Sequence, residues 1–244
     1  MKQSGTMRVG YLEWEPCVYR PDGAGEFIGI FVDMTKEIAQ TLNLKIEWVK
    51  TDLASFTKDL VDGKMDFCVG PTFMTLPRAT RVQFTQAVAY IGNSGVVRRG
   101  SVLAPRTWDA LAQPGIKIAV LRGQAMDTYA KRAFPKADLL VLPGDDLEAP
   151  LDAASNGRAD IGLSNTVTVL RYLEKDSNVE AVFVGTDEQM DILPICWSTA
   201  PGDDALLRFL DSTISYFKST GRLKTLQANY PIKLLYDTPP LHAE

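Results

Sequence analysis

The residue type most often used for acid–base and metal chemistry is almost missing from this sequence. One histidine occurs among the 244 residues, His242, two residues from the C-terminus in a proline-rich tail. Histidine-based nucleophilic triads, histidine-ligated zinc and imidazole acid–base catalysis all need this side chain inside the fold. We therefore expect no metal site and no cofactor.

The three cysteines are the next candidates for chemistry. Cys17, Cys68 and Cys196 have no Cys-x-x-Cys spacing, and an odd number cannot pair completely. At least one is therefore expected to be a buried free thiol. A disulfide between Cys17 and Cys68 is an alternative that would suit an oxidising compartment, and spacing does not decide between the two.

Composition limits the kinds of partner. Lysine and arginine number 26 against 30 aspartates and glutamates, and the net charge of −4 leaves no basic surplus for binding nucleic acid. Hydrophobic residues make up 45% of the chain, enough for one large or two medium cores. No apolar stretch reaches the roughly 18 to 20 residues needed to cross a bilayer.

No secretion signal is visible, because Met1 to Thr6 is polar and lacks an apolar core. Either the protein is cytoplasmic, or this is a processed form with a replacement start in which residues 1–6 are a foreign leader. The first strand is expected from Met7.

Strand and helix patterns alternate along the chain. The expected strands are Met7–Leu12, Lys45–Val49, Met65–Val69, Ile116–Leu121, Leu139–Leu142, Ala159–Leu163 and Ala181–Gly185. The expected helices are Asp33–Leu42, Ser55–Asp62, Ala125–Ala133, Leu147–Asn156, Thr166–Leu173 and Ala205–Ser219, the last with the clearest amphipathic spacing. Such alternation predicts an α/β protein with a mainly parallel sheet flanked by helices.

Because the pattern restarts near Ile116, two α/β halves are expected. The extended runs Ser94–Arg98 and Leu193–Thr199 are candidates for crossing between them. Lobe 1 would then comprise residues 1–93 and 197–244, and lobe 2 residues 94–196. A discontinuous arrangement of this kind leaves a ligand cleft between the lobes and lets two crossover strands act as a hinge.

Six short motifs occur in a fixed order. They are Gly29–Met34 (GIFVDM), Asp66–Ala79 (DFCVGPTFMTLPRA), Val82–Thr85 (VQFT), Leu121–Gln124 (LRGQ), Asn156–Asp160 (NGRAD) and Gly221–Leu223 (GRL). Over about residues 7–232 the series resembles the bacterial extracellular solute-binding proteins of family 3. The resemblance implies the two-lobe type II periplasmic binding protein fold, a monomer in the periplasm after removal of a signal peptide, and the membrane subunits of an ABC transporter as partner.

The resemblance also implies ligand contacts. Arg78 occupies the position of the family arginine that binds the ligand carboxylate, which a guanidinium can hold with two parallel hydrogen bonds. Thr75 matches the threonine that helps to hold the same carboxylate. Capping of the next helix is its alternative role, and both roles are compatible.

Five further positions are expected at the site by the same resemblance. Trp14 stands where the family has an aromatic over the ligand, with packing of its loop on the core as the alternative. Glu13 can face the cleft or water. Leu53 replaces a second aromatic wall, and Gln124 and Ala125 lie in the turn whose amides meet the carboxylate from lobe 2.

Three positions depart from the family. Asn165 replaces the aspartate that pairs with the ligand α-ammonium, Phe73 replaces a serine that contacts the ammonium, and Phe31 replaces an acidic residue. Removing one partner of a buried charge pair costs about 3 to 5 kcal/mol. We therefore expect a ligand without a free α-ammonium, or a bulky cation facing Trp14 and Phe73.

The sequence thus predicts a non-enzymatic solute-binding protein that captures a small carboxylate-bearing ligand, an amino acid or an amino-acid-like organic acid or amine, by hinge closure. Two alternatives stay open. Cyclohexadienyl dehydratases are similar in fold and sequence, and such an enzyme would need an acid, for which Glu13 and Glu188 are candidates. The other alternative is the sensory domain of a membrane receptor.

Overall fold

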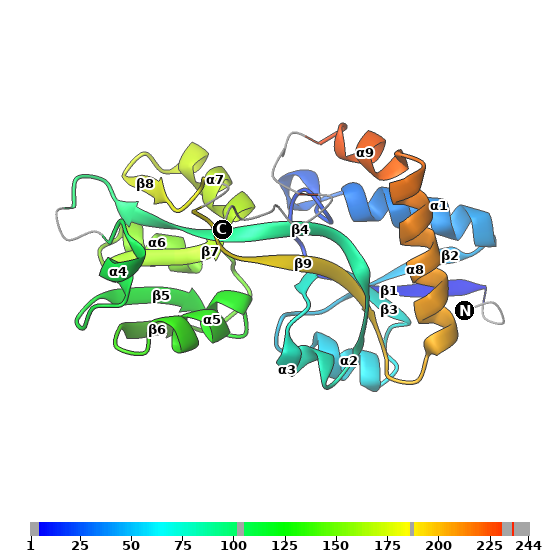
Figure 1. Cartoon of the computed structure of the whole chain (residues 1–244). Coiled ribbons are helices and arrows are strands. Elements are labelled where there is room, and N and C mark those ends of the chain that lie inside the picture. The colour runs from blue at the N-terminus through cyan, green and yellow to red at the C-terminus, as the bar shows by residue number, and fades with distance from the viewer. Residues whose placement is uncertain (1–4, 102–104, 186–187, 231–235, 237–244) are drawn as a thin grey trace. The chain divides into compact units, whose positions relative to one another are not determined.

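The computed structural model describes residues 5–101, 105–185, 188–230 and 236, so His242 and most of the expected leader lie outside the described residues. The chain forms two compact units (Figure 1). Unit 1 takes its described residues from Met1–Tyr90 and Pro194–Asp237, and unit 2 from Ile91–Leu193. Within these residues, no helix combines the length and hydrophobicity that a membrane span requires.

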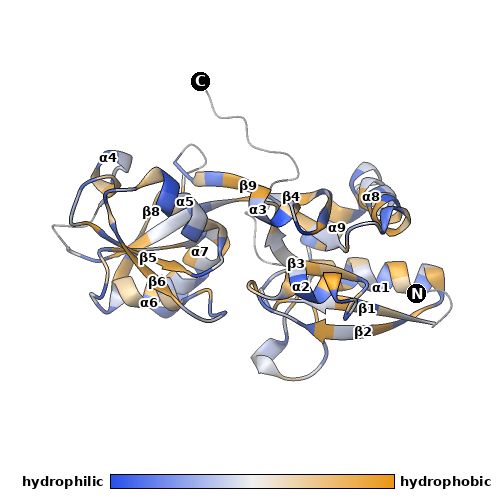
Figure 2. Cartoon of the chain, turned by 90° about the horizontal axis from the view of Figure 1, so that it is seen from below, coloured by the Kyte–Doolittle hydropathy of each residue, from blue (hydrophilic) through white to orange (hydrophobic). Residues whose placement is uncertain are grey.

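Unit 1 is built on the strand order β2-β1-β3-β9. Its strands are β1 (Thr6–Tyr11), β2 (Lys45–Lys50), β3 (Phe67–Phe73) and part of β9 (Met190–Thr199). Its helices are α1 (Ile30–Leu42), α2 (Phe56–Val61), α3 (Leu76–Ala79), α8 (Asp204–Ser219) and α9 (Arg222–Gln227), with a 3-10 turn at Pro21–Gly23. Strand β1 is parallel to β2 and β3, whereas β9 is antiparallel to β3. In Figure 2, α8 carries both hydrophobic and hydrophilic residues, as expected for a helix with one face on the core.

Unit 2 has the order β4-β7-β5-β6, with β8 also paired to β4. Its strands are β5 (Lys117–Leu121), β6 (Asp138–Leu142), β7 (Ile161–Asn165), β8 (Val179–Val182) and part of β4 (Gln83–Arg98). Its helices are α4 (Trp108–Leu111), α5 (Ala125–Ala133), α6 (Ala149–Ser155) and α7 (Thr166–Lys175). Strand β5 is parallel to β6 and β7, and β4 is antiparallel to β7 and β8.

Two strands belong partly to each unit. The boundary falls between Tyr90 and Ile91 in β4 and between Leu193 and Pro194 in β9. The lobe limits expected from the sequence, 93/94 and 196/197, lie in the same two strands.

Both faces of the unit 2 sheet are covered. The neighbouring residues Val96 and Val97 of β4 belong to different apolar clusters, because successive strand side chains point to opposite faces. Val97 packs with Met126 of α5, and Val96 packs with residues of α6 and α7. Helix α6 approaches β7 so closely that a Cβ at Gly162 would lie 2.0 Å from the Pro150 carbonyl oxygen. Glycine is therefore needed there.

The cysteine expectation is confirmed and its alternative is wrong. Cys17, Cys68 and Cys196 are all buried free thiols, so Cys17 and Cys68 do not form a disulfide. Burial raises the pKa of Cys68 and of Cys196 to about 12, because an apolar surrounding disfavours the thiolate. All three behave as core side chains.

Candidate functional site

Arg78 lies on α3, directly after β3. Its Nη1 donates a hydrogen bond to the Phe73 carbonyl at 2.9 Å, and its guanidinium carbon lies 5.2 Å from the centroid of the Phe56 ring. Burial lowers the pKa of Arg78 to about 10, because desolvation disfavours the charged form. Unit 1 thus holds a cation in a largely apolar surrounding, where an anionic ligand group would stabilise it.

Phe73 and Thr75 precede Arg78, at the end of β3 and at the start of α3. Thr75 is the N-cap residue of α3 but makes no side-chain capping hydrogen bond. Its carbonyl accepts from the amides of Arg78 and Ala79 at 3.0 and 2.9 Å. The helix therefore begins without the hydroxyl, which is left for another contact. Phe73 is buried at the end of β3, opposite Ile195 of β9.

The remaining unit 1 candidates differ in exposure. Leu53 packs against the apolar cluster that contains Phe56, the ring below Arg78. Trp14 is 6% exposed and its backbone pairs with Val18. This burial is what the core-packing alternative for Trp14 predicts.

Glu13 and Phe31 make contacts that explain their residue types. Glu13 forms an ion pair with Arg20, and both side chains are about one-third exposed. Phe31 is fully buried in α1, and its ring centroid lies 5.9 Å from that of Trp197. An acidic residue at position 31 would be buried in this core, so the departure from the family is a packing feature.

In unit 2, Gln124 precedes α5 and is 3% exposed. Its Nε2 donates to Ser164 Oγ at 3.2 Å, and Ser164 Oγ donates to the Leu147 carbonyl at 3.2 Å. The single hydroxyl proton goes to Leu147, so Ser164 accepts from Gln124 and fixes the orientation of the amide. Oε1 of Gln124 is then a buried acceptor with no hydrogen-bond partner in the described part of the chain. Ala125, also buried, begins α5.

Asn165 ends β7 and caps α7. Its Oδ1 accepts from the Thr168 amide at 2.9 Å, and its Nδ2 donates to Thr168 Oγ1 at 2.8 Å. The side chain is 3% exposed. One Nδ2 hydrogen remains for a further bond, so Asn165 offers a ligand a donor where the family has an acceptor with a full charge.

A group of polar residues that was not predicted from the sequence lies beside these two. Asn93 is paired in register with Asn165, and Ser94 with Ser164. Like Gln124, the side chains of Asn93, Ser94 and Thr166 each carry a buried oxygen without a partner among the described residues. In the sequence, this group is indicated by Asn93 and Ser94, two polar residues inside the largely apolar run 87–97.

These oxygens limit what unit 2 can bind. Each buried polar group without a partner costs about 1 to 3 kcal/mol, so such groups normally meet water or a polar ligand. Parallel strands β5 and β7 end at the same edge of the sheet, where Gln124 and Asn165 follow. Unit 2 therefore presents neutral hydrogen-bonding groups at this edge.

Asp191 was also missed. It has a left-handed backbone, with φ of 43°, and burial raises the pKa of its carboxyl. Burial of Tyr129, and then the charge of Asp191, raise the pKa of Tyr129, while Arg132 lowers the pKa of Asp191. Glu188, proposed from the sequence as an acid, is exposed.

The two α/β units and the strands β4 and β9 define the class, which is the two-lobe fold of type II periplasmic binding proteins. An ancestral amino acid-binding protein, a precursor of cyclohexadienyl dehydratase, superposes with a TM-score of 0.79, at 23% identity over 93% of this chain and 96% of that one. The solute receptor for L-cysteine of Neisseria gonorrhoeae gives a TM-score of 0.81, at 22% identity over 96% and 92%. The predicted fold class is confirmed.

The chain belongs to the bacterial extracellular solute-binding proteins, family 3, whose sequence pattern matches residues 7–232. The cyclohexadienyl dehydratase of Pseudomonas aeruginosa is 23% identical over 99% of this chain and 87% of its own length. The lysine/arginine/ornithine-binding periplasmic protein of Escherichia coli is also 23% identical, over 74% and 69%. This protein is thus a solute-binding protein, as predicted, and its relatives include both binding proteins and an enzyme.

Asp191→Asn should raise the free energy of unfolding at pH 7. The raised pKa means that the folded state favours the protonated carboxyl of Asp191. The free energy of unfolding of the wild-type protein therefore falls as pH rises through this folded-state pKa, whereas the amide of the variant does not titrate. Asparagine also tolerates the left-handed backbone. Urea denaturation at pH 7 and at about pH 4, close to the ordinary pKa of aspartate, measures the gain, which should shrink at the lower pH.

Asp145→Asn is the control, because Asp145 is exposed in the same unit and should show little change. Equal or lower stability of Asp191→Asn at pH 7 would contradict the burial of this charge.

Proposed function

We propose that this protein captures a small carboxylate-bearing ligand, with Arg78 as the carboxylate anchor, and delivers it to the membrane subunits of an ABC importer. It would act as a monomer in the periplasm, which is the compartment of the lysine/arginine/ornithine-binding and histidine-binding relatives of Escherichia coli. Closure of the two units around the ligand would exclude water from the Arg78 pair and so strengthen it.

The observation that carries this proposal is the position of the half-buried Arg78, whose guanidinium lies beside the Phe73 carbonyl and over the Phe56 ring. A cation with a lowered pKa is a cost to the folded protein, and a carboxylate with bidentate geometry offsets that cost better than any neutral group. The hydroxyl of Thr75, which makes no capping hydrogen bond, lies three residues before Arg78 at the start of the same helix and would donate to the same carboxylate.

The rest of the ligand should be polar but without a free α-ammonium. The unit 2 candidates Gln124 and Asn165 are neutral, and their buried surroundings contain further amide and hydroxyl oxygens. Glu13, the carboxylate that could have replaced the family aspartate, is paired with Arg20. A buried ammonium would therefore find acceptors but no counter-charge among the candidate residues.

Replacing Arg78 by alanine should weaken binding by about two to four decades, the equivalent of about 3 to 5 kcal/mol for a buried ion pair that loses one partner. Arg78→Lys should restore only part, because lysine lacks the planar fork. A thermal-shift screen of organic acids and amino acids identifies a ligand, and calorimetric titration of that ligand gives the dissociation constants.

Arg81→Ala is the matched control, since it removes the same charge from an exposed position three residues further on. Binding by Arg78→Ala within about threefold of wild type would remove Arg78 from the site.

Asn165→Asp should separate the ligand classes without unfolding the protein, because aspartate caps a helix as well as asparagine does. A carboxylate ligand without an ammonium should bind more weakly to this variant, owing to repulsion, and the matching α-amino acid should bind more tightly. Titration of both against wild type and the variant tests this, with the exposed Asn156→Asp as charge control. Tight wild-type binding of an unmodified α-amino acid would defeat the ligand assignment while leaving Arg78 as anchor.

A dehydratase is the second candidate function. It is favoured by the Pseudomonas relative and by Asp191, a carboxyl whose raised pKa suits a general acid. Incubation with prephenate, a cyclohexadienyl acid, followed by the absorbance of an aromatic product, distinguishes the two functions. A binding protein should leave prephenate unchanged, whereas turnover that is lost in Asp191→Asn would establish the enzyme.

A further inference from the structure

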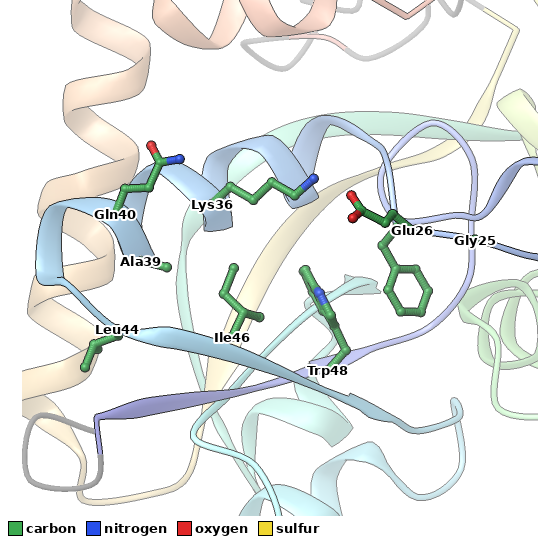
Figure 3. Close-up of a pocket in the computed structure, with 9 residues that line it drawn as sticks. Gly25, Glu26, Lys36, Ala39, Gln40, Leu44, Ile46 and Trp48 are labelled. Atoms are coloured by element: carbon green, nitrogen blue, oxygen red, sulfur yellow. The ribbon is translucent and has the colours of Figure 1, made fainter.

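Unit 1 contains a pocket that none of the candidate site residues lines. Its volume is about 430 Å³, and its walls come from α1, from β2 and from residues 25–27 of the preceding loop (Figure 3). This volume is within the usual range of about 300 to 1,000 Å³ for small-molecule sites. Because every lining residue belongs to unit 1, the pocket is complete within that unit.

One wall of the pocket is apolar and aromatic. Ile46 and Trp48 alternate along β2 and therefore face the same side, where Ala39 of α1 completes the surface. Trp48 and Phe27 are only half-buried, although aromatic rings normally bury most of their area. The fold thus leaves planar apolar surface open to the pocket.

Contacts on the far side hold these rings in place. The centroids of Trp48 and Phe27 are 5.5 Å apart, and Tyr11 lies 6.1 Å from Trp48 and 4.5 Å from Phe27. The guanidinium carbon of Arg20 lies 4.9 Å from the Phe27 centroid. A wall fixed by several ring contacts is preorganised, which reduces the entropy lost on binding.

The rim carries one charge of each sign. In Figure 3 the charged ends of Lys36 and Glu26 point toward one another at the pocket. Neither side chain has an ion pair or hydrogen bond with the part of the chain that the structure describes. A ligand could therefore place an anionic group at Lys36 and a cationic group at Glu26.

We propose that this pocket binds a small zwitterion with a planar apolar body, such as an aromatic amino acid. The ring would lie against Trp48 and Ile46, the carboxylate at Lys36 and the ammonium at Glu26. The site is independent of Arg78 and of the proposed function. Because the rim charges are partly solvated, the dissociation constant should be weak, roughly 0.1 to 1 mM.

The probe is L-phenylalanine, and the readout is the indole N–H signal of Trp48 in a nitrogen–proton NMR spectrum. The sequence has four tryptophans, and Trp48→Phe assigns the signal by its disappearance. L-Phenylalanine should shift this signal saturably. Phenethylamine and 3-phenylpropionate, which each keep one charge, should bind about threefold or more weakly.

Lys36→Gln and Glu26→Gln should each weaken the effect of L-phenylalanine by about threefold. Glu47→Gln is the control, because Glu47 precedes Trp48 on β2 but lies outside the pocket. Arg78→Ala should leave the Trp48 shift unchanged, which separates this pocket from the candidate functional site.

Three results would overturn the proposal. The first is the absence of a Trp48 shift at about 10 mM L-phenylalanine, ten times the weakest dissociation constant expected. The second is the loss of the shift in Arg78→Ala. The third is equal binding of the three probes, with no change in Lys36→Gln or Glu26→Gln. A Trp48 shift that depends on protein concentration without ligand would instead assign the surface to self-association.

Discussion

The guanidinium of the half-buried Arg78 is held between the Phe73 carbonyl and the Phe56 ring, and this constraint ties together three elements of unit 1. The Phe73 carbonyl supplies one hydrogen bond and the Phe56 ring supplies a polarisable face, but both are weaker partners than a carboxylate. Strand β3, helix α2 and the short helix α3 must be packed together to hold these three groups in place. The packing of these three elements therefore holds the guanidinium of Arg78 in a fixed position.

The candidate site residues of unit 2 carry neutral hydrogen-bonding groups rather than a charge. The amides of Gln124 and Asn165 are oriented by hydrogen bonds to Ser164 and Thr168, so each presents a defined remaining atom. Burying a neutral polar group costs less free energy than burying a charge, and such a group selects a ligand by the direction of its hydrogen bonds. Unit 2 therefore differs from unit 1, in which the candidate group is the charged Arg78.

The sequence predicted the regular elements well and the irregular ones poorly. Helix α5 has the predicted bounds and α8 begins one residue earlier than predicted, because long amphipathic spacing is a strong signal. Helix α1 begins three residues before Asp33, because Gly29 ends the loop and Ile30 continues the buried face. Helices α3 and α4, with four residues each, are too short to show a period.

The same limit applies to the candidate site. The position of Arg78 came from a motif, but its desolvation depends on Phe56, which is distant in sequence, and no local pattern reports it. Strand β4 was expected only over Ser94–Arg98, because glycines at 92 and 95 and the polar pair between them interrupt its apolar pattern. That interruption is where Asn93 and Ser94 lie, so the residues that weakened the strand prediction are part of the buried polar group.

A carboxylate anchor serves a binding protein and a dehydratase equally, so Arg78 does not separate the two functions. The two functions differ in whether a protonated acid comes within hydrogen-bond distance of the ligand. Glu13 is engaged by Arg20 and Glu188 is exposed, which leaves Asp191 as the half-buried acid with a raised pKa. Arg132 lowers its pKa and Asp191 in turn raises the pKa of Tyr129, and neither Arg132 nor Tyr129 is among the candidate ligand contacts. Its pKa is raised by desolvation, which acts on structural and catalytic carboxyls alike, so the choice between binding and catalysis depends on whether Asp191 contacts the ligand.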